Sequence, residues 1–346
     1  TGIQKQIFNT VYQLMAVKQQ TPELLQQAKT LLMLPDYFGF RLTGNKLSEY
    51  TNGSTTQLVN PDTFQWDKEL IRKLGYPEDI FLPLQMPGTK VGQLLPEIQK
   101  EVGFDLEVVL CGSHDTASAV MAVPQTEGDG IYISSGTWSL MGIESLKPVI
   151  TEDAAAANFT NEGGYDHRFR FLKNIMGLWM IQSVRHEYND AYSFAQLCDM
   201  AEESKEFPSR VDVNDQSFLS PDSMVEAIRQ YCHKTGQPVP ESVGELTSVV
   251  YRSLAQSYGE TVRGLEKIAG KTYDSIHIIG GGSNAAYLNQ LTADATGKTV
   301  YAGPGEATAI GNLLAQMIHA GDLADLKSAR KCVRESFEIK TFAPAK

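Results

Sequence analysis

One stretch near the C-terminal end limits the fold more than any other part of the chain. The apolar run at 275–279 predicts a buried strand, residues 280–284 predict a glycine-rich turn, and a helix is expected from about Ala285. A second strand at 299–302 and a second helix at 307–320 follow in the same order. Strands that alternate with helices are typical of an α/β unit, so an α/β fold is expected.

The glycine-rich turn has two interpretations. Gly280, Gly282 and Ala285 fit the Gly-x-Gly-x-x-Ala pattern of dinucleotide-binding folds, in the required place between a strand and a helix. That pattern also needs an acid about twenty residues later, at the end of the next strand, to bind the ribose. No acid follows that strand until Glu306, which disfavours a dehydrogenase. The other interpretation is a turn that lets a nucleotide approach the backbone near a helix N-terminus.

A second turn that contains glycine lies between two predicted strands, 131–134 and 138–141. Its residues Ser135, Gly136 and Thr137 can direct several N–H and O–H donors at one anion. The same residue types dominate ordinary turns. This pattern alone therefore fits both an anion site and a plain hairpin.

An acidic residue stands where residues 105–110, apolar enough for a buried strand, turn into a predicted helix. Asp115 follows the small residues Gly112 and Ser113. In one interpretation it caps the helix, because Asp is favoured at that position. In the other it is a general base that the positive end of the helix keeps ionised. A weak base suits a proton that leaves late in phosphoryl transfer. The adjacent His114, taken alone, is more typical of a packed side chain than of a ligand.

The chain as a whole predicts two lobes, 1–124 and 125–346, because the residues Gly128-Asp129-Gly130 mark a natural boundary. The other expected elements, in chain order, are mainly helices from Ile3 to about residue 75 with one at 67–74, a hairpin around Asp166 and His167, and three helices of which the last runs from about Glu241 to Ala269.

Composition argues against several classes of function. The formal net charge of −11 disfavours a nucleic-acid-binding surface, which depends on clustered Lys and Arg. No apolar run approaches the roughly 18 residues of a membrane span, so no membrane association is expected. Four scattered cysteines without a CxxC pair favour a reducing, cytoplasmic location. The six histidines form no obvious metal-binding set, and no Walker, HExxH or G-x-S-x-G motif is present.

Three motifs in this order resemble the FGGY carbohydrate kinases. They are Gly-Ser-His-Asp-Thr-Ala-Ser-Ala-Val at 112–120, Ser-Ser-Gly-Thr-Trp-Ser-Leu-Met-Gly at 134–142, and Gly-Gly-Gly-Ser-Asn at 280–284 with Gly-Pro-Gly-Glu-Ala-Thr-Ala-Ile-Gly at 303–311. The likeness covers essentially the whole chain. The first two motifs look closer to the L-rhamnulose kinases of this family than to its glycerol, xylulose or gluconate kinases. The resemblance implies the actin-like ATPase fold, in which two ribonuclease-H-like lobes close over ATP and sugar.

The resemblance also implies roles for individual residues. Asp115 matches the proton acceptor for the ketose C1 hydroxyl, and His114 and Thr116 beside it match sugar contacts. The other implied contacts are Asn174 to the sugar, and Gly136, Thr137, Gln182, Gly280, Gly281 and Gly282 to ATP. Without the resemblance, Asn174 and Gln182 near a predicted helix start would be interpreted as solvated polar residues.

The chain departs from the family pattern at its start. Members open with a strand hairpin whose Asp, Gly and Thr or Ser residues bind phosphate and Mg²⁺, and no such segment precedes Ile3. The sequence also lacks an initiator Met. We therefore expect a truncated first lobe, with the metal ligands in the missing segment. Little or no activity of this polypeptide alone is expected, since phosphoryl transfer depends on positioning and charge neutralisation.

The reaction implied is transfer of the ATP γ-phosphate to the C1 hydroxyl of L-rhamnulose with Mg²⁺, giving L-rhamnulose 1-phosphate in L-rhamnose catabolism. The expected partners are this sugar and ATP, in a monomer or weak homodimer. Two alternatives stay open. One is a kinase for another ketose, such as fuculose, and the other is a non-catalytic actin-like module that binds sugar or nucleotide.

Overall fold

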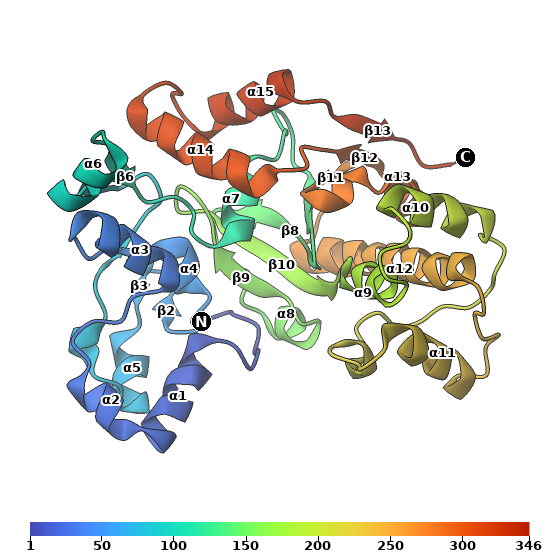
Figure 1. Cartoon of the computed structure of the whole chain (residues 1–346), viewed down its shortest axis with the longest axis horizontal. Coiled ribbons are helices and arrows are strands. Elements are labelled where there is room, and N and C mark those ends of the chain that lie inside the picture. Colours follow the sequence, from blue (N-terminus) through green and yellow to red (C-terminus); the bar gives the residue numbers. More distant parts are fainter. Residues whose placement is uncertain (346) are drawn as a thin grey trace. The chain divides into compact units, whose positions relative to one another are not determined.

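The structure, a computed structural model, describes residues 1–345 and divides into two compact units (Figure 1). Each unit is built from segments far apart in the sequence. The chain passes from one unit to the other inside two strands, β8 (Trp138–Ser145) and β10 (Phe169–Met176). Unit 1 contains residues 1–122, 144–172 and 308–329, and unit 2 contains residues 123–143, 173–307 and those from 330 onward.

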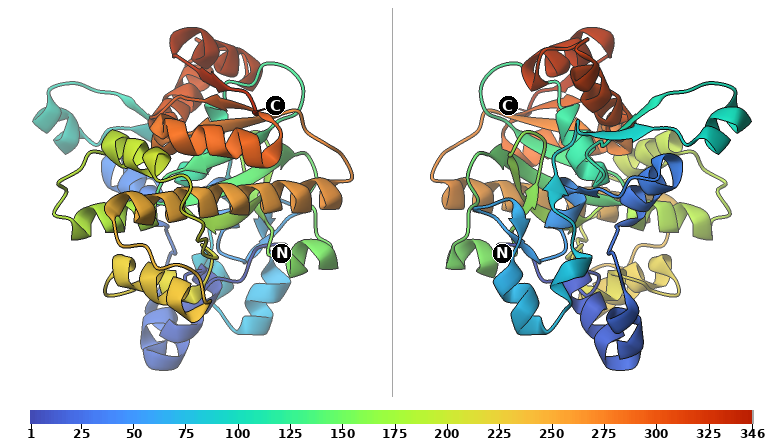
Figure 2. Two further views of the ribbon diagram at one scale, coloured as in Figure 1. Left: turned by 90° about the vertical axis from the view of Figure 1, so that its right-hand side faces the viewer. Right: turned by 90° about the vertical axis from the view of Figure 1, so that its left-hand side faces the viewer.

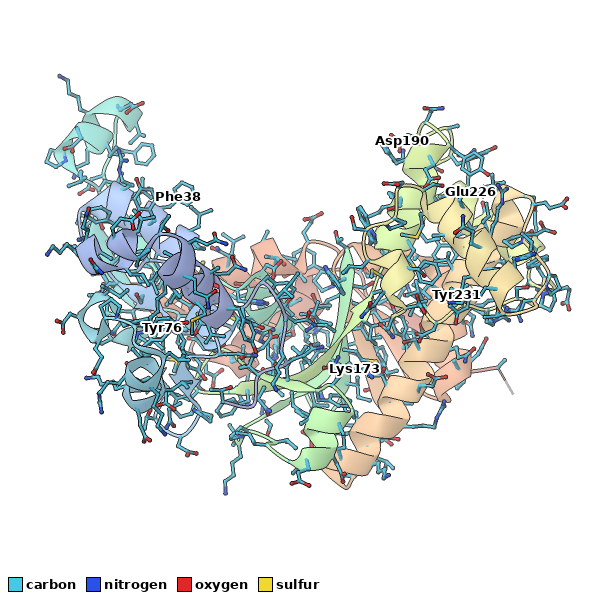
Figure 3. The ribbon with its side chains drawn as sticks, turned by 90° about the horizontal axis from the view of Figure 1, so that it is seen from below. Phe38, Tyr76, Lys173, Asp190, Glu226 and Tyr231 are labelled. Atoms are coloured by element: carbon cyan, nitrogen blue, oxygen red, sulfur yellow. The ribbon has the colours of Figure 1, made fainter. Side chains whose placement is uncertain are left out.

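The first helices of unit 1 contribute to a small apolar core. They are α1 (Thr10–Gln20), α2 (Pro22–Gln27) and α5 (Lys68–Leu74). The predicted helix at 67–74 is confirmed, because Asp67 accepts the N–H of Leu70 at 2.9 Å and Gly75 ends α5 with a left-handed φ of 68°. Nearby, the hydroxyl of Tyr76, labelled in Figure 3, donates a hydrogen bond of 2.7 Å to the carbonyl oxygen of Val11.

The helix that the sequence predicts from Ile3 begins only at Thr10, so this prediction is wrong for residues 3–9. A helix would pair the carbonyl oxygens of Ile3 and Gln4 with N–H groups four residues later. These oxygens instead accept hydrogen bonds from the side-chain amide of Gln57, at 3.3 and 2.8 Å. A partner about fifty residues away in the chain therefore overrides the local apolar periodicity.

Unit 1 also contains short two-stranded sheets and the predicted hairpin. The hairpin turn is confirmed, because Asp166 and His167 both have the positive φ, 55°, that a tight turn needs. The strand expected to be buried at 105–110 is short and only half-buried, since it pairs with one neighbour alone. The pairs are β1 (Ser48–Glu49) with β4 (Leu84–Gln85), β2 (Val59–Asn60) with β3 (Gln65–Trp66), β5 (Lys90–Gln93) with β6 (Glu107–Val109), and β9 (Thr160–Gly163) with β10.

Helix α7 (Asp115–Met121) begins within two residues of Ser113, as the sequence predicts. The other helices of unit 1 are α3 (Leu34–Thr43), α4 (Tyr50–Ser54), a 3₁₀ turn at Glu78–Ile80, α6 (Pro96–Val102), α8 (Glu152–Ala156) and all but the first residue of α14 (Ala307–Ala320).

The sheet of unit 2 has the strand order β13-β12-β11-β7-β8 (Figure 1). Strands β7 (Ile131–Ser135), β11 (Ser275–Ile279) and β12 (Thr299–Ala302) are parallel, whereas β8 and β13 (Lys340–Phe342) run antiparallel to their neighbours. Nearly every residue of β7 and β11 is buried, as in a sheet covered on both faces. The predicted alternation of strands and helices in this part of the chain is confirmed.

Four helices, not the predicted three, lie between β10 and Gly270. The last, α12, crosses the left view of Figure 2 as a long helix. It starts with a capping box of Ser242 and Glu245 and ends at Gly270, whose φ of 67° is left-handed. Although α12 has 27 residues, neither it nor any other helix within residues 1–345 is apolar enough to cross a membrane. The helices of unit 2 are α9 (Trp179–Glu187), α10 (Phe194–Glu203), α11 (Met224–Lys234), α12 (Val243–Ala269), α13 (Ala286–Thr296) and most of α15 (Leu326–Ser336).

Gly311 on α14 allows a very close approach to α7 within unit 1. A Cβ atom at this position would lie 1.7 Å from the carbonyl oxygen of Ser118, so even alanine requires the backbone to move. We expect Gly311→Ala to lower the free energy of unfolding by about 1–3 kcal/mol or more, as overpacking does, in urea denaturation. The matched control is Gly39→Ala on α3, whose Cβ would make an ordinary contact of 3.8 Å with Val91. Equal losses in the two variants would contradict this account.

Candidate active site

Asp115 is the first residue of α7, and its carboxylate is largely open to solvent. The side chain is 79% exposed. Its Oδ1 accepts the N–H of Thr116 at 2.7 Å, while Oδ2 accepts no hydrogen bond within residues 1–345. The N-cap residue of α7 is His114 and not Asp115. Only one carboxylate oxygen of Asp115 accepts a helix N–H, so a capping role would leave the other oxygen unused. Thr116 is buried, and its hydroxyl lies 3.4 Å from the same Oδ1. The three predicted residues are thus brought together, with one oxygen free to accept a proton.

His114 lies beside a buried ion pair. Its imidazole is 22% exposed, and its Nδ1 lies 3.4 Å from Nη2 of Arg170. That guanidinium is completely buried and lies 3.1 Å from Oε2 of Glu162. Burial lowers the pKa of His114, and the charge of Arg170 lowers this pKa further. The imidazole is therefore neutral at neutral pH.

In unit 2, the turn between β7 and β8 leaves the donors of Thr137 unused. The carbonyl oxygens of Gly136 and Thr137 accept the N–H groups of Leu178 and Trp179 at 3.0 and 3.1 Å. Thr137 itself is exposed, and in the part of the chain that the structure describes its N–H and hydroxyl donate to no protein group. Such a turn can offer both donors to one anion.

The three glycines of the second turn have different surroundings. A Cβ atom at Gly280 would lie 2.9 Å from the carbonyl oxygen of Ser135, and one at Gly282 would lie 2.0 Å from the Ser135 hydroxyl oxygen. Packing against the end of β7 therefore requires both glycines. Gly281 is exposed, and no atom lies within 4 Å of its Cβ position. Of the three, only Gly281 faces open space in which a ligand could approach the backbone.

The last two predicted site residues are both half-buried in unit 2. Asn174 lies on β10, shortly before α9 begins, and Gln182 lies in the first half of α9. Neither residue has the solvated surroundings that the sequence alone would suggest.

Comparison with known proteins identifies the family. Residues 1–122 match the model of the N-terminal domain of the FGGY family of carbohydrate kinases, and residues 131–320 match that of its C-terminal domain. The chain belongs to this family. It is 52% identical over 345 residues to a rhamnulokinase from Halalkalibacterium halodurans, covering 100% of this chain and 73% of the relative. It is 46% identical over 347 residues to a rhamnulokinase from Bacillus subtilis, covering 99% and 70%.

Solved structures at much lower identity share the fold. A ligand-bound xylulose kinase from Lactobacillus acidophilus has a TM-score of 0.76 at 16% identity, covering 100% of this chain and 69% of that one. The glycerol kinase of Plasmodium falciparum with ADP has a TM-score of 0.76 at 15% identity, covering 99% and 69%. The predicted actin-like sugar-kinase fold and the class of ATP-dependent sugar kinase are therefore confirmed, and the dehydrogenase interpretation of the glycine turn is wrong.

A buried glutamate of this FGGY kinase, which the sequence analysis did not identify, holds the turn before Asp115. Glu49 accepts hydrogen bonds from the N–H and hydroxyl of Ser113, at 3.1 and 2.6 Å. It also accepts from the N–H and hydroxyl of Thr51, both at 2.6 Å. The Thr51 hydroxyl in turn accepts the N–H of His114 at 3.2 Å. The Glu49 carboxylate thus fixes the backbone of Ser113 directly and that of His114 through the Thr51 hydroxyl. The only local signal was the acid at the N-cap position of α4.

A second buried acid adjoins Glu49. Asp36 on α3 accepts the N–H of Glu49 at 3.2 and 3.3 Å from its two oxygens. Burial, with a smaller contribution from the charge of Glu49, raises the pKa of Asp36 to about 7. Burial also raises the pKa of Glu49, while the bonds from Ser113 and Thr51 oppose that rise. These hydrogen bonds favour Glu49 as the ionised member of the pair, with the proton on Asp36.

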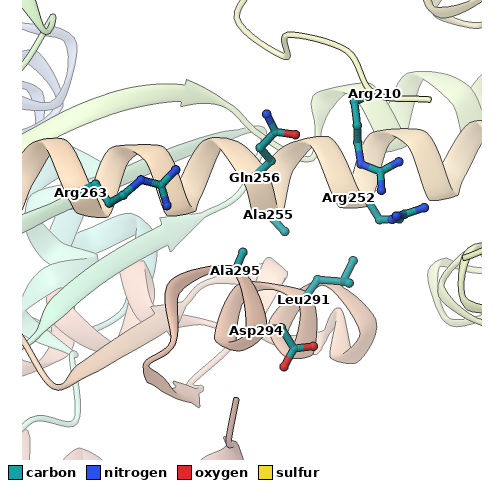
Figure 4. A pocket seen from close by; sticks show the side chains of 8 residues that line it. All are labelled: Arg210, Arg252, Ala255, Gln256, Arg263, Leu291, Asp294 and Ala295. Atoms are coloured by element: carbon teal, nitrogen blue, oxygen red, sulfur yellow. The ribbon is translucent and has the colours of Figure 1, made fainter. Parts of the chain in front are cut away.

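A charged cavity of about 360 Å³ lies between α12 and α13 in unit 2 (Figure 4). Arg210, Arg252, Arg263 and Asp294 line it, and none of the predicted site residues does. Arg210 donates to the carbonyl oxygens of residues 207–209, and Arg252 to those of 205 and 207. Arg252 thus attaches the loop after α10 to α12, and Arg210 stabilises the loop itself, so both have a structural role.

Replacement of Glu49 tests its role as an anchor. In Glu49→Gln, an NH₂ group would face donors where the carboxylate only accepts, and a buried donor would lose its partner. We expect the free energy of unfolding to fall by about 1–3 kcal/mol in urea denaturation. Glu69→Gln is the control, because Glu69 forms an exposed pair with Lys73 at 2.7 Å, and such pairs contribute about 0–1 kcal/mol. An unchanged stability of Glu49→Gln would remove the anchoring role.

The raised pKa of Asp36 predicts a pH dependence. Because the folded state binds this proton more tightly than an unfolded chain with the ordinary pKa of 3.8, the stabilisation is fully present below about pH 4 and is lost as the pH rises towards 7. Asp36→Asn keeps an oxygen acceptor but cannot ionise. Urea denaturation between pH 4 and 8 should therefore show a native stability that falls relative to this variant as the pH rises. A constant difference across this range would rule out a buried proton on Asp36.

Proposed function

We propose that this FGGY kinase transfers the γ-phosphate of ATP to the C1 hydroxyl of L-rhamnulose and acts in L-rhamnose catabolism. The observation that carries the proposal is the similarity to curated rhamnulokinases, which are 41–52% identical over nearly the whole chain. A cytoplasmic location is proposed with it, because the four cysteines are free thiols, as in a reducing compartment.

In this proposal Asp115 is the general base. The C1 oxygen of the sugar forms the new bond to the γ-phosphorus, the bond from that phosphorus to the bridging oxygen of ADP breaks, and the hydroxyl proton passes to Asp115. The open Oδ2 of Asp115 supports this role. We propose that His114, Thr116 and Asn174 contact the sugar.

The nucleotide is proposed to bind to the turns of unit 2. The free N–H and hydroxyl of Thr137 suit a phosphate oxygen, and the open space at Gly281 suits the adenosine side of ATP. Gln182 is proposed as a further contact to ATP. In this account Gly136 allows the turn that presents Thr137, while Gly280 and Gly282 shape the turn that presents Gly281.

Mg²⁺ is proposed to enter as a complex with the ATP phosphates. Residues 1–345 contain no group of three or more His, Cys, Asp or Glu side chains that could hold a metal ion. Mg²⁺ is commonly held by nucleotide phosphates and waters with only one or two carboxylates, so the phosphates would supply much of its coordination.

Replacement of the proposed base gives the most direct test. In a chain that also carries the N-terminal strand hairpin of the family, Asp115→Asn should lower kcat for L-rhamnulose phosphorylation by about two to four orders of magnitude, the usual range for general acid–base catalysis. The affinity for ATP, measured by calorimetry, should stay nearly unchanged. Asp105→Asn, at an exposed position of the same unit, is the control and should retain full turnover. Comparable turnover in Asp115→Asn would exclude this carboxylate as the base.

A panel of ketoses separates the proposed substrate from the alternatives. ADP release, measured with L-rhamnulose, L-fuculose, D-xylulose and no sugar, should give the highest kcat/KM for L-rhamnulose. A preference for L-fuculose would support the other ketose kinase. Binding of sugar or nucleotide without phosphoryl transfer would support the non-catalytic module.

A further inference from the structure

Arg170 on β10 is a completely buried arginine next to the proposed sugar-binding residues. Its Nε donates to the carbonyl oxygen of Gly163 at 3.0 Å, and its Nη2 lies 3.1 Å from Oε2 of Glu162. Within the described residues, its Nη1 has no hydrogen-bond partner. A guanidinium keeps its proton in proteins and has only donors. A neighbouring group that can either donate or accept must therefore accept.

His114 is that neighbouring group. Its Nδ1 lies 3.4 Å from Nη2 of Arg170 and 3.6 Å from Oδ1 of Asp115, and its Nε2 lies 3.8 Å from Oε2 of Glu162. Two N–H groups that face each other repel, so Nδ1 presents its lone pair to Arg170. The ring proton of the neutral imidazole is then on Nε2, where it faces the carboxylate of Glu162.

We propose that Arg170 is a positioning residue that holds His114 as the neutral Nε2–H tautomer and thereby leaves Asp115 without a histidine hydrogen bond. This inference rests on the proposed role of Asp115 as the base. With its proton on Nδ1, His114 would donate to the adjacent carboxylate, and as an imidazolium it would form an ion pair with it. Both interactions favour the ionised carboxylate and weaken it as a proton acceptor.

The charges around His114 act in opposite directions. Burial is the main cause that lowers the pKa of the imidazole, and the charge of Arg170 lowers it further, whereas Glu162 and Asp115 raise it. Removal of Arg170 alone would leave Glu162 as a buried charge without a partner, which is strongly destabilising. The informative variant therefore replaces both members of the ion pair, as Arg170→Gln with Glu162→Gln.

Nitrogen NMR of the ¹⁵N-labelled native protein tests the inference directly, because it needs neither a substituted site nor a measurement of turnover. The His114 signals are assigned by their loss in His114→Gln. We expect Nδ1 to have the ¹⁵N chemical shift of an unprotonated ring nitrogen and Nε2 that of a protonated one. We also expect no titration of the ring across the neutral range. The side chain of His186 is 85% exposed and serves as an internal reference for the signals of a solvent-exposed ring. A protonated Nδ1 of His114, or a His114 ring that titrates across the neutral range, would overturn the proposal.

The double variant gives the second measurement. Removal of both side chains should raise the pKa of His114, because the charge of Arg170 affects this pKa more than that of Glu162, although burial still holds it below the ordinary value. We also expect the Nδ1–H form to be populated. For L-rhamnulose phosphorylation, kcat of this variant should fall about tenfold from its plateau at one pH unit below the pKa that NMR measures for His114 in the variant, because about nine-tenths of the imidazole is then charged. Native protein should lack this loss, and an identical pH profile in both would also overturn the proposal. If a chain that also carries the N-terminal strand hairpin of the family does not phosphorylate L-rhamnulose, the proposed function fails. A protonated Nδ1 of His114 contradicts only the present inference.

Discussion

The hydrogen bonds that Glu49 accepts are the interaction on which the candidate base depends. Asp115 itself has few contacts, because its side chain is mostly exposed. Its position is set by the two residues before it, and both are attached to the Glu49 and Thr51 side chains. A reactive group that must stay open to a substrate cannot be held by its own packing. Its rigidity comes instead from buried polar groups beneath its backbone, as preorganised sites require.

The proposed nucleotide-binding turns of unit 2 are also held in place by neighbouring residues, here through close packing of glycines instead of hydrogen bonds to a carboxylate. Ser135 at the end of β7 leaves no room for a Cβ atom at Gly280 or Gly282. The two turns are therefore packed against each other, while the N–H and hydroxyl of Thr137 donate to no group of the described residues and the Cβ position of Gly281 faces open space. In each unit, one exposed group that would meet a ligand, Asp115 or Thr137, is thus positioned by neighbouring residues that are more buried.

Local patterns in the sequence were sufficient where the structure is governed by local forces. The strands at 275–279 and 299–302 and the helix at 307–320 have the predicted bounds, because apolar runs between glycine turns leave little choice. The prediction of a helix from Ile3 was wrong because the Gln57 side chain donates hydrogen bonds to carbonyl oxygens that a helix would use.

The motifs supplied the candidate site residues. They gave no sign of Glu49, since its partner Ser113 is 64 positions away, and they could not separate Gly281 from the two glycines that packing requires. The lobe boundary near residue 125 stays a prediction.

The crossings of the chain inside β8 and β10 have a consequence for how this kinase can be divided. Because each unit is assembled from three stretches of sequence, no single cut releases an intact unit, and a recombination event with one breakpoint cannot exchange one unit for that of a relative. A cut between residues 143 and 144, or between 172 and 173, would leave both fragments with pieces of both units. Such fragments would have to reassociate to restore either fold, which makes these two strands unfavourable places for proteolytic nicking or gene fusion.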